Sequence, residues 1–313
     1  MANKRKILIK MRNKADPISV FSRVKCVLGE SPLWHPLRNS LFWLDILECR
    51  LYEKAFDSEA AEFDRVWELP ETGSALALDG NSSDSLFIVT DISFSRINLE
   101  TGRFSQFISL SSNVNMRAND GGVAPNGDFW FGTMEKNPTG QNGAVYSISS
   151  NGEITHQLAG IGIPNTFAWS LDGRLLYLSD SIRQKMFVFE VDDGHAVSHS
   201  RKTTFINLSS TDATPDGGAM DSDGNLWNAQ WGGFNVKCYS PRGEVLDSIE
   251  LPVPQVSSCC FGGSGNSSLF ITSAREGMSE AELEKYPLSG CVFIKKMRTG
   301  FGVEPSVFVA NYG

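Results

Sequence analysis

Residues 214–233 read TPDGGAMDSDGNLWNAQWGG, and this stretch contains a short unit that repeats along the chain. Two apolar segments, GAM and LWNAQ, flank the turn DSDGN. Asp-Gly in such a turn supplies the positive φ that a tight hairpin needs. The unit therefore predicts a β-hairpin in which Asp221 and Asp223 are turn residues. An EF-hand loop starting at Asp221 would need a glutamate at its twelfth position, where the chain has Gly232.

The same strand–turn–strand unit recurs six times, and each copy is followed by a further short apolar strand. The second strands of successive copies begin 42 to 50 residues apart. A period of this length, with several strands in each repeat, is typical of a β-propeller. We therefore expect an all-β, six-bladed β-propeller. The second strands are LFWLD (41–45), LFIVTD (86–91), DFWFGT (128–133), LLYLSD (175–180), NLWNAQ (225–230) and LFITSA (269–274).

The two ends of the chain suggest how the ring closes. The segment ISVFSRVKCVL (18–28) precedes the first full repeat and is expected to form the outer strand of the last blade, which removes an open sheet edge. The chain also finishes on a strand-like segment, SVFVAN (306–311). One short helix is expected at 279–286, where Ser279 and Glu282 form a capping box. The predicted domains are a disordered basic tail (1–17) and a catalytic propeller (18–313).

Composition narrows the classes of protein to which this chain can belong. The formal net charge of −8 argues against a nucleic-acid binder, which usually has a basic face. No apolar run of about 18 residues is present, so no membrane span is expected. The six cysteines lack C-x-x-C spacing and are read as reduced thiols of a cytoplasmic protein. The four histidines are expected at the surface, and the protein is expected to be a monomer or a homodimer.

Polar residues recur where the inner strand of each blade begins. The first strand of a propeller blade lines the central channel, so the residue before it points toward the axis. Several carboxylates and amides meeting there would be poorly satisfied in a narrow channel. A hard divalent cation with oxygen ligands resolves this problem, and it makes Asp216 the carboxylate of interest in the opening stretch. The six positions are Glu30, Gly73, Asn119, Asn165, Asp216 and Ser257.

Four stretches of the chain resemble the family of senescence marker protein, gluconolactonase and luciferin-regenerating enzyme. The resemblance runs from about Val20 onward, and members of this family are six-bladed propellers with one divalent metal on the axis. It implies that Glu30, Asn165 and Asp216 are the metal ligands. The stretches are LGESPLWHPLRNSLFWLDI (28–46), RANDGGVAPNGDFWFGTM (117–134), IPNTFAWSLDGRLLYLSDS (163–181) and TPDGGAMDSDGNLWNAQWGG (214–233).

The resemblance also implies roles around the metal, with three departures. Arg117 and Asn119 match positions that hold the substrate, and Asp216 also matches the proposed general base. Ser31 and Thr166 stand where family members commonly have glycine, which keeps the ligands but can shift the pocket wall. Glu135 is a candidate substrate contact, although it is out of register with the acidic contact of some relatives and equally fits a solvated loop residue.

The function implied by the resemblance is hydrolysis of sugar-acid lactones, with a small-molecule sugar lactone as the partner. The cation, Ca²⁺ first and Zn²⁺, Mg²⁺ or Mn²⁺ as alternatives, would polarise the lactone carbonyl while Asp216 activates water. The segments 135–142 and 274–287 are expected to cover the site and select the sugar. Two other readings stay open, a metal-dependent aryl esterase or phosphotriesterase and a non-catalytic propeller that binds partners.

Overall fold

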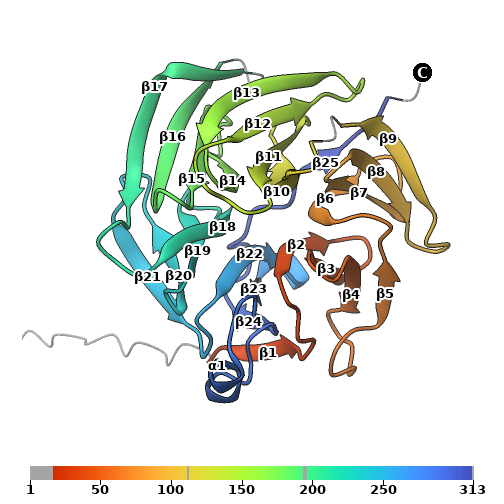
Figure 1. The fold of residues 1–313 in the computed structure, drawn as a ribbon. Coiled ribbons are helices and arrows are strands. Elements are labelled where there is room, and N and C mark those ends of the chain that lie inside the picture. The colour runs from red at the N-terminus through yellow and green to blue at the C-terminus, as the bar shows by residue number, and fades with distance from the viewer. Residues whose placement is uncertain (1–16, 111–112, 193–195, 312–313) are drawn as a thin grey trace, which may run out of the picture.

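The protein forms six small β-sheets arranged around a central axis, as a six-bladed propeller (Figure 1). The computed structural model describes residues 17–110, 113–192 and 196–311. The predicted basic tail therefore lies, apart from its last residue, outside the described residues. Blade 1 contains β2 (Gly29–His35), β3 (Ser40–Asp45), β4 (Arg50–Ala55) and β5 (Arg65–Glu68). Blade 2 contains β6 (Gly73–Asp79), β7 (Ser85–Thr90), β8 (Ser93–Asn98) and β9 (Phe104–Ser109).

The remaining blades repeat this antiparallel order from the axis outward. Blade 3 contains β10 (Met116–Val123), β11 (Phe129–Glu135), β12 (Gly143–Ile148) and β13 (Ile154–Ile161). Blade 4 contains β14 (Pro164–Trp169), β15 (Leu175–Asp180), β16 (Lys185–Asp192) and β17 (Ala196–Asn207). Blade 5 contains β18 (Thr214–Met220), β19 (Leu226–Trp231), β20 (Asn235–Tyr239) and β21 (Val245–Glu250). Blade 6 contains β22 (Val256–Gly262), β23 (Ser268–Ser273), β24 (Val292–Lys296) and β1 (Ser19–Ser22).

The N-terminal strand closes the ring as predicted. β1 pairs antiparallel with β24, with Ser19 opposite Ile294, and so forms the outer strand of blade 6 (Figure 1). The helix α1 (Glu280–Lys285) lies in the loop between β23 and β24 and begins with the predicted capping box of Ser279 and Glu282. No helix in the described part of the chain is long and apolar enough to cross a membrane.

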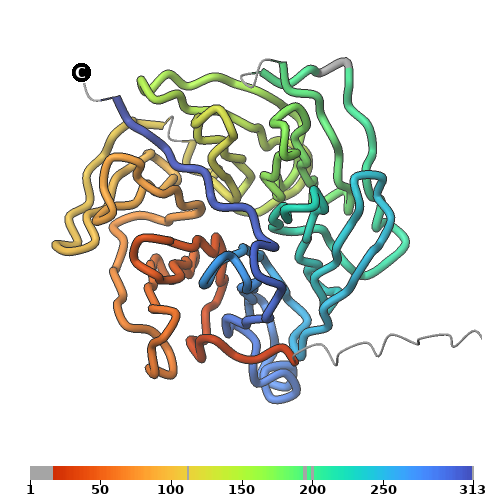
Figure 2. The backbone as a smooth tube through the Cα atoms, turned by 180° about the vertical axis from the view of Figure 1, so that it is seen from behind, coloured from red at the N-terminus to blue at the C-terminus, as the bar shows by residue number. Residues whose placement is uncertain are grey.

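The C-terminal segment makes a second connection between blades, which the sequence did not predict. After blade 6 the chain crosses the back of the propeller (Figure 2). Gly302 bridges to Asp221 in blade 5, and β25 (Val307–Phe308) then pairs in parallel with β6 in blade 2. The Phe308 side chain is fully buried, with its ring centroid 5.0 Å from that of Phe87. This strap, residues 298–311, therefore links blades that are not neighbours.

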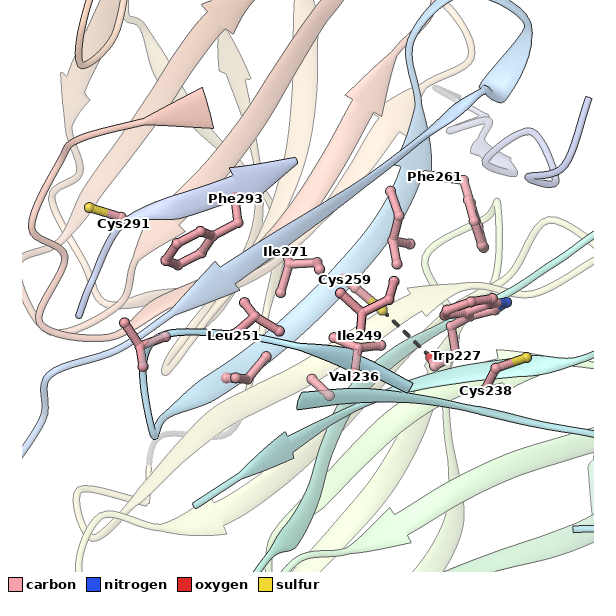
Figure 3. Close-up of a cluster of buried hydrophobic side chains, with 14 residues drawn as sticks. Trp227, Val236, Cys238, Ile249, Leu251, Cys259, Phe261, Ile271, Cys291 and Phe293 are labelled. Carbon is pink, nitrogen blue, oxygen red and sulfur yellow. Dashed lines mark hydrogen bonds between the residues drawn. The ribbon is translucent and has the colours of Figure 1, made fainter. Parts of the chain in front are cut away.

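The core lies between the blades, because each sheet packs a face against the next sheet. Figure 3 shows the cluster between blades 5 and 6, which contains Trp227 and Val236 of blade 5 and Phe261 of blade 6. Cys259 lies in the same cluster and donates from its Sγ to the Trp227 carbonyl at 3.5 Å. All six cysteines are free thiols in the structure.

The prediction for the histidines is wrong at one position. His35 is only 3% exposed, at the end of the inner strand β2, and its Nδ1 accepts from the Arg38 amide. Side chains alternate between the two faces of β2, and His35 falls on the face that packs into the protein. Its position next to a turn had suggested a surface residue. His156 is exposed on the outer strand β13, as expected. His195 and the side chain of His199 lie outside the described residues.

Candidate metal and active site

Each inner strand is interrupted by a shift in pairing register near its first residues. In β18 the shift lies between Pro215 and Gly218, and in β14 it lies between Asn165 and Ala168. The inner strands of the other four blades shift at the corresponding level. A β-bulge of this kind bends the strand and redirects a side chain. The candidate site residues Glu30, Asn119, Asn165 and Asp216 all lie at this level.

A hydrogen-bonded row joins the predicted substrate-binding residues to one predicted metal ligand. Arg117 Nη1 donates to Asn119 Oδ1 at 2.8 Å, and Asn119 Nδ2 donates to Asn165 Oδ1 at 2.9 Å. Asn165 Nδ2 donates in turn to Ser181 Oγ at 2.8 Å. The row ends where the Ser181 hydroxyl donates to the Pro215 carbonyl, beside the proposed general base. Blades 3, 4 and 5 are therefore tied together at the candidate site.

Carboxylates from three blades lie close enough at this level to repel one another. Burial raises the pKa of Glu30 to about 8, and repulsion from Asp120 adds to the effect. Burial also raises the pKa of Asp216 well above its usual range, followed by repulsion from Glu30 and Asp120. The structure thus brings together Glu30 and Asp216, as the sequence predicted.

Asp120 is a third carboxylate that the sequence reasoning missed. Burial raises its pKa to about 6. Its Oδ1 accepts from the Gly121 amide and its Oδ2 from the Thr166 amide, each at 2.8 Å. The prediction took one residue from each blade, whereas the bulge in β10 turns both Asn119 and Asp120 toward the site. In the sequence, the only indication of this third carboxylate was that Asn119 is directly followed by Asp120.

Arg117 supplies the positive charge at the edge of this acidic group. Burial lowers its pKa, while the charges of Glu276, Glu30, Asp91 and Asp216 act to raise it. Glu276 belongs to the segment 274–287, so this part of the predicted cover lies within electrostatic reach of the site.

Glu135 does not join the cluster around Asp216. Its Oε2 accepts from the amide of Thr139 at 2.9 Å, and its Oε1 accepts from Asn142 Nδ2 at 3.0 Å. These contacts hold the segment 136–142 in place. Glu135 and Arg117 also line a cavity of about 610 Å³ between blades 2 and 3. Its role as a substrate contact stays a prediction.

The donor set of the site suits a hard divalent cation. The described residues contain no group of three or more His, Cys, Asp or Glu side chains with the spacing of a metal site. The predicted set has a different composition, because it combines two carboxylates with the amide of Asn165. These oxygen donors are the ones that Ca²⁺ and Mg²⁺ prefer. Burial and then mutual repulsion raise the pKa values of Glu30 and Asp216, and a bound cation would offset both by stabilising the ionised carboxylates.

Comparisons with known proteins agree with this architecture. Residues 28–275 match the family model described as SMP-30/Gluconolactonase/LRE-like region. The chain is 30% identical to L-arabinolactonase of Azospirillum brasilense over 91% of this chain and 93% of that protein. It is 32% identical to 6-deoxy-6-sulfogluconolactonase of Pseudomonas putida over 90% of this chain and 96% of that protein. A solved structure of regucalcin from Agrobacterium tumefaciens, described as a calcium-binding protein, superposes with a TM-score of 0.87 at 28% identity, covering 94% and 97% of the two chains.

Proposed function

Because the chain belongs to the SMP-30/gluconolactonase/LRE-like family, we propose that it is a metal-dependent hydrolase of sugar-acid lactones. The observation that carries the proposal is the electrostatic coupling of Glu30 with Asp216, next to the hydrogen-bonded row of Arg117, Asn119 and Asn165. The relatives named as lactonases support the reaction class.

Glu30, Asn165 and Asp216 would hold the divalent cation through oxygen atoms. Such a cation supplies a Lewis acid that polarises a carbonyl and stabilises the developing oxyanion. Ca²⁺ is the ion proposed first, because the regucalcin neighbour is described as calcium-binding. Zn²⁺, Mg²⁺ and Mn²⁺ accept the same ligand atoms and are alternatives that reconstitution with single metals would separate.

Side chains of the protein would transfer the proton and bind the sugar. Asp216 would take a proton from the attacking water, which adds to the lactone carbonyl carbon and opens the ring as the ester C–O bond breaks. Asp216 would then pass this proton to the departing ring oxygen, which leaves as a hydroxyl group, and the product is the free acid. In the described part of the chain, Nη1 is the atom of Arg117 that hydrogen-bonds to protein, so Nε and Nη2 can donate to the substrate.

We propose that the rest of the sugar binds in the cavity beside Arg117. Asn115 and Tyr146 line it together with Arg117, and both can hydrogen-bond to hydroxyl groups. The two named lactonase relatives differ in their sugars, so the size and substituents of the favoured lactone have to be measured. The cavity wall between blades 2 and 3 is where the selectivity would reside.

The test is hydrolysis followed by proton release on a panel of five- and six-carbon aldonolactones and an aldarolactone. Chelated protein, metal-reloaded protein and Asp216→Asn would be compared. Asp223→Asn is the matched control, because Asp223 lies in an exposed turn of the same blade as Asp216 and pairs with Arg298 of the C-terminal strap. Metal-dependent turnover that Asp216→Asn abolishes and Asp223→Asn keeps would support the proposal.

The same panel would include an aryl ester and a phosphotriester. Turnover of these substrates above that of every lactone would move the assignment to an esterase or phosphotriesterase. A protein that binds the cation but turns over none of the substrates would favour the non-catalytic reading.

A further inference from the structure

Thr166 adopts a backbone conformation that a threonine rarely takes. Its φ is +60°, in the left-handed region, and its side chain is fully buried. A β-branched residue is a genuine outlier there, and such strain persists only where the surroundings hold it. Glycine, which lacks a Cβ, would adopt the same conformation at little cost. The threonine side chain must therefore contribute something that glycine does not.

The hydroxyl of Thr166 is fully used in hydrogen bonds. Oγ1 donates its proton to the main-chain carbonyl of Asp216. It lies 2.9 Å from Asn228 Nδ2, which donates to it, and 2.8 Å from Ser179 Oγ. One donated and two accepted bonds satisfy the complete capacity of a hydroxyl. Asn228 Nδ2 also reaches the Asp216 carbonyl at 2.8 Å, so both residues hold the same backbone group.

The main chain and the methyl group of Thr166 make further contacts at the site. Its amide donates to Asp120 Oδ2 at 2.8 Å, which fixes the third carboxylate. Its Cγ2 lies 3.3 Å from the position that a Cβ on Gly218 would occupy, so the methyl group lies against that part of blade 5. Thr166 also directly follows Asn165. One residue of blade 4 thus contacts groups from blades 3 and 5 that approach the axis.

We propose that Thr166 is a positioning residue, whose hydroxyl fixes the backbone of Asp216 so that its carboxylate faces Glu30 and Asn165. The strained φ is kept because the hydroxyl requires a Cβ at this position. The effect on turnover rests on the proposed function, whereas the effect on the cation site does not need lactone turnover to be observed.

Three variants separate the hydroxyl from the backbone strain. Thr166→Gly removes both, Thr166→Ser keeps the hydroxyl, and Thr166→Val keeps the branched shape without the hydroxyl. Each would be measured by urea unfolding of chelated protein, by calorimetric titration with Ca²⁺, and by lactone kcat and KM. Urea unfolding measures stability and calorimetry measures Ca²⁺ affinity, and neither measurement depends on activity.

The variants are expected to change the stability of the protein and the function of the site in different ways. Thr166→Gly should unfold at the same or a higher urea concentration than the parent, because it loses strain together with the hydrogen bond. Its Ca²⁺ affinity and kcat should both fall about tenfold, with KM changed less than about threefold, since one lost hydrogen bond corresponds to roughly that factor. Thr166→Ser should restore affinity and kcat to within about threefold of the parent. Thr166→Val should lose affinity and also unfold earlier, because Asn228 and the Asp216 carbonyl lose a partner.

Two results with the Thr166 variants would overturn the positioning role. One is a Thr166→Gly protein that binds Ca²⁺ and turns over lactone like the parent, and the other is a Thr166→Ser protein as impaired as Thr166→Gly. If no lactone is hydrolysed by any form, but Ca²⁺ affinity falls in Thr166→Gly and returns in Thr166→Ser, the positioning role stands and the proposed function fails. A parent that binds no divalent cation would overturn both.

Discussion

The metal-free protein should lose stability as the pH rises from 5 to 8, because its site carboxylates prefer to be protonated in the folded state. The pKa of Glu30 is raised to about 8 and that of Asp120 to about 6, in both cases first by burial. A raised pKa in the folded state means that the folded protein binds the proton more tightly than the unfolded chain does. The resulting stability is complete below the unfolded pKa values near 4 and is lost as the pH rises through the folded values.

The size of the loss follows from these pKa values. One pKa unit corresponds to about 1.4 kcal/mol, so Glu30 alone contributes up to about 5 kcal/mol and Asp120 up to about 3 kcal/mol. The two contributions overlap because the carboxylates repel each other, and Glu30 is partly exposed to solvent in the channel. Part of the Asp120 contribution is also lost below pH 5. We therefore expect the free energy of unfolding to fall by about 4 kcal/mol between pH 5 and pH 8, a large share of the stability of a typical domain.

Urea unfolding of chelated protein at unit pH intervals measures this loss. Excess Ca²⁺ should cancel it, because a cation bound as proposed would pair with the ionised carboxylates and stabilise the folded state. Asp120→Asn should reduce the pH slope, whereas Asp223→Asn removes the same formal charge from a surface pair and should leave the slope unchanged. A metal-free stability that is flat or rising over this range would refute the view that the three carboxylates face one another.

Two further predictions concern the back of the propeller and the substrate side of the site. Phe308→Ala should lower the free energy of unfolding by about 3–5 kcal/mol in urea, because it empties a buried position against Phe87 and Phe94, while turnover per folded molecule stays within about twofold. An unchanged unfolding midpoint would show that the strap does not stabilise the ring. Arg117→Ala should reduce lactone kcat/KM about 10- to 100-fold, and Arg117→Lys should recover little of it, because an ammonium group lacks the guanidinium fork. Full recovery in the lysine variant would mean that only the positive charge matters.

The number of blades and the closure of the ring were readable from the sequence, because each follows from local pattern. Each repeat carries its own alternation and turn residues, and an unpaired outer edge on the last blade needs a strand such as β1 to cover it. The partner of the C-terminal strand was not readable in this way. β25 has only two residues, and its parallel pairing with β6 depends on the path of the chain across the channel.

The site was predicted in part, for a related reason. Choosing one residue at the mouth of each blade selected Glu30, Asn119, Asn165 and Asp216, which lie at one level of the structure, whereas their roles in binding stay a prediction. The same rule missed Asp120, because a bulge leaves an additional residue unpaired and the sequence does not reveal where the register shifts. The role of Thr166 was hidden too, since a positive φ at a β-branched residue is visible only in the folded backbone.

The bulges explain why the geometry of the site and the closure of the ring are connected. A bulge leaves backbone groups without their usual strand partners, and these groups need other hydrogen bonds when they are buried. In five blades, a hydroxyl or carboxylate side chain at the bulge meets this need by bonding to the main chain of the next blade. Blade 5 has Gly217 at this position, where the Oγ of Ser258 from blade 6 fills the space that a side chain would take. Thr166 is thus one member of a ring of contacts between blades, and the members nearest the carboxylates set their positions. The contacts are Ser31 Oγ with the Leu76 amide, Ser74 Oγ with the Ala118 carbonyl, Asp120 Oδ2 with the Thr166 amide, Thr166 Oγ1 with the Asp216 carbonyl, and Ser257 Oγ with the Gly29 carbonyl.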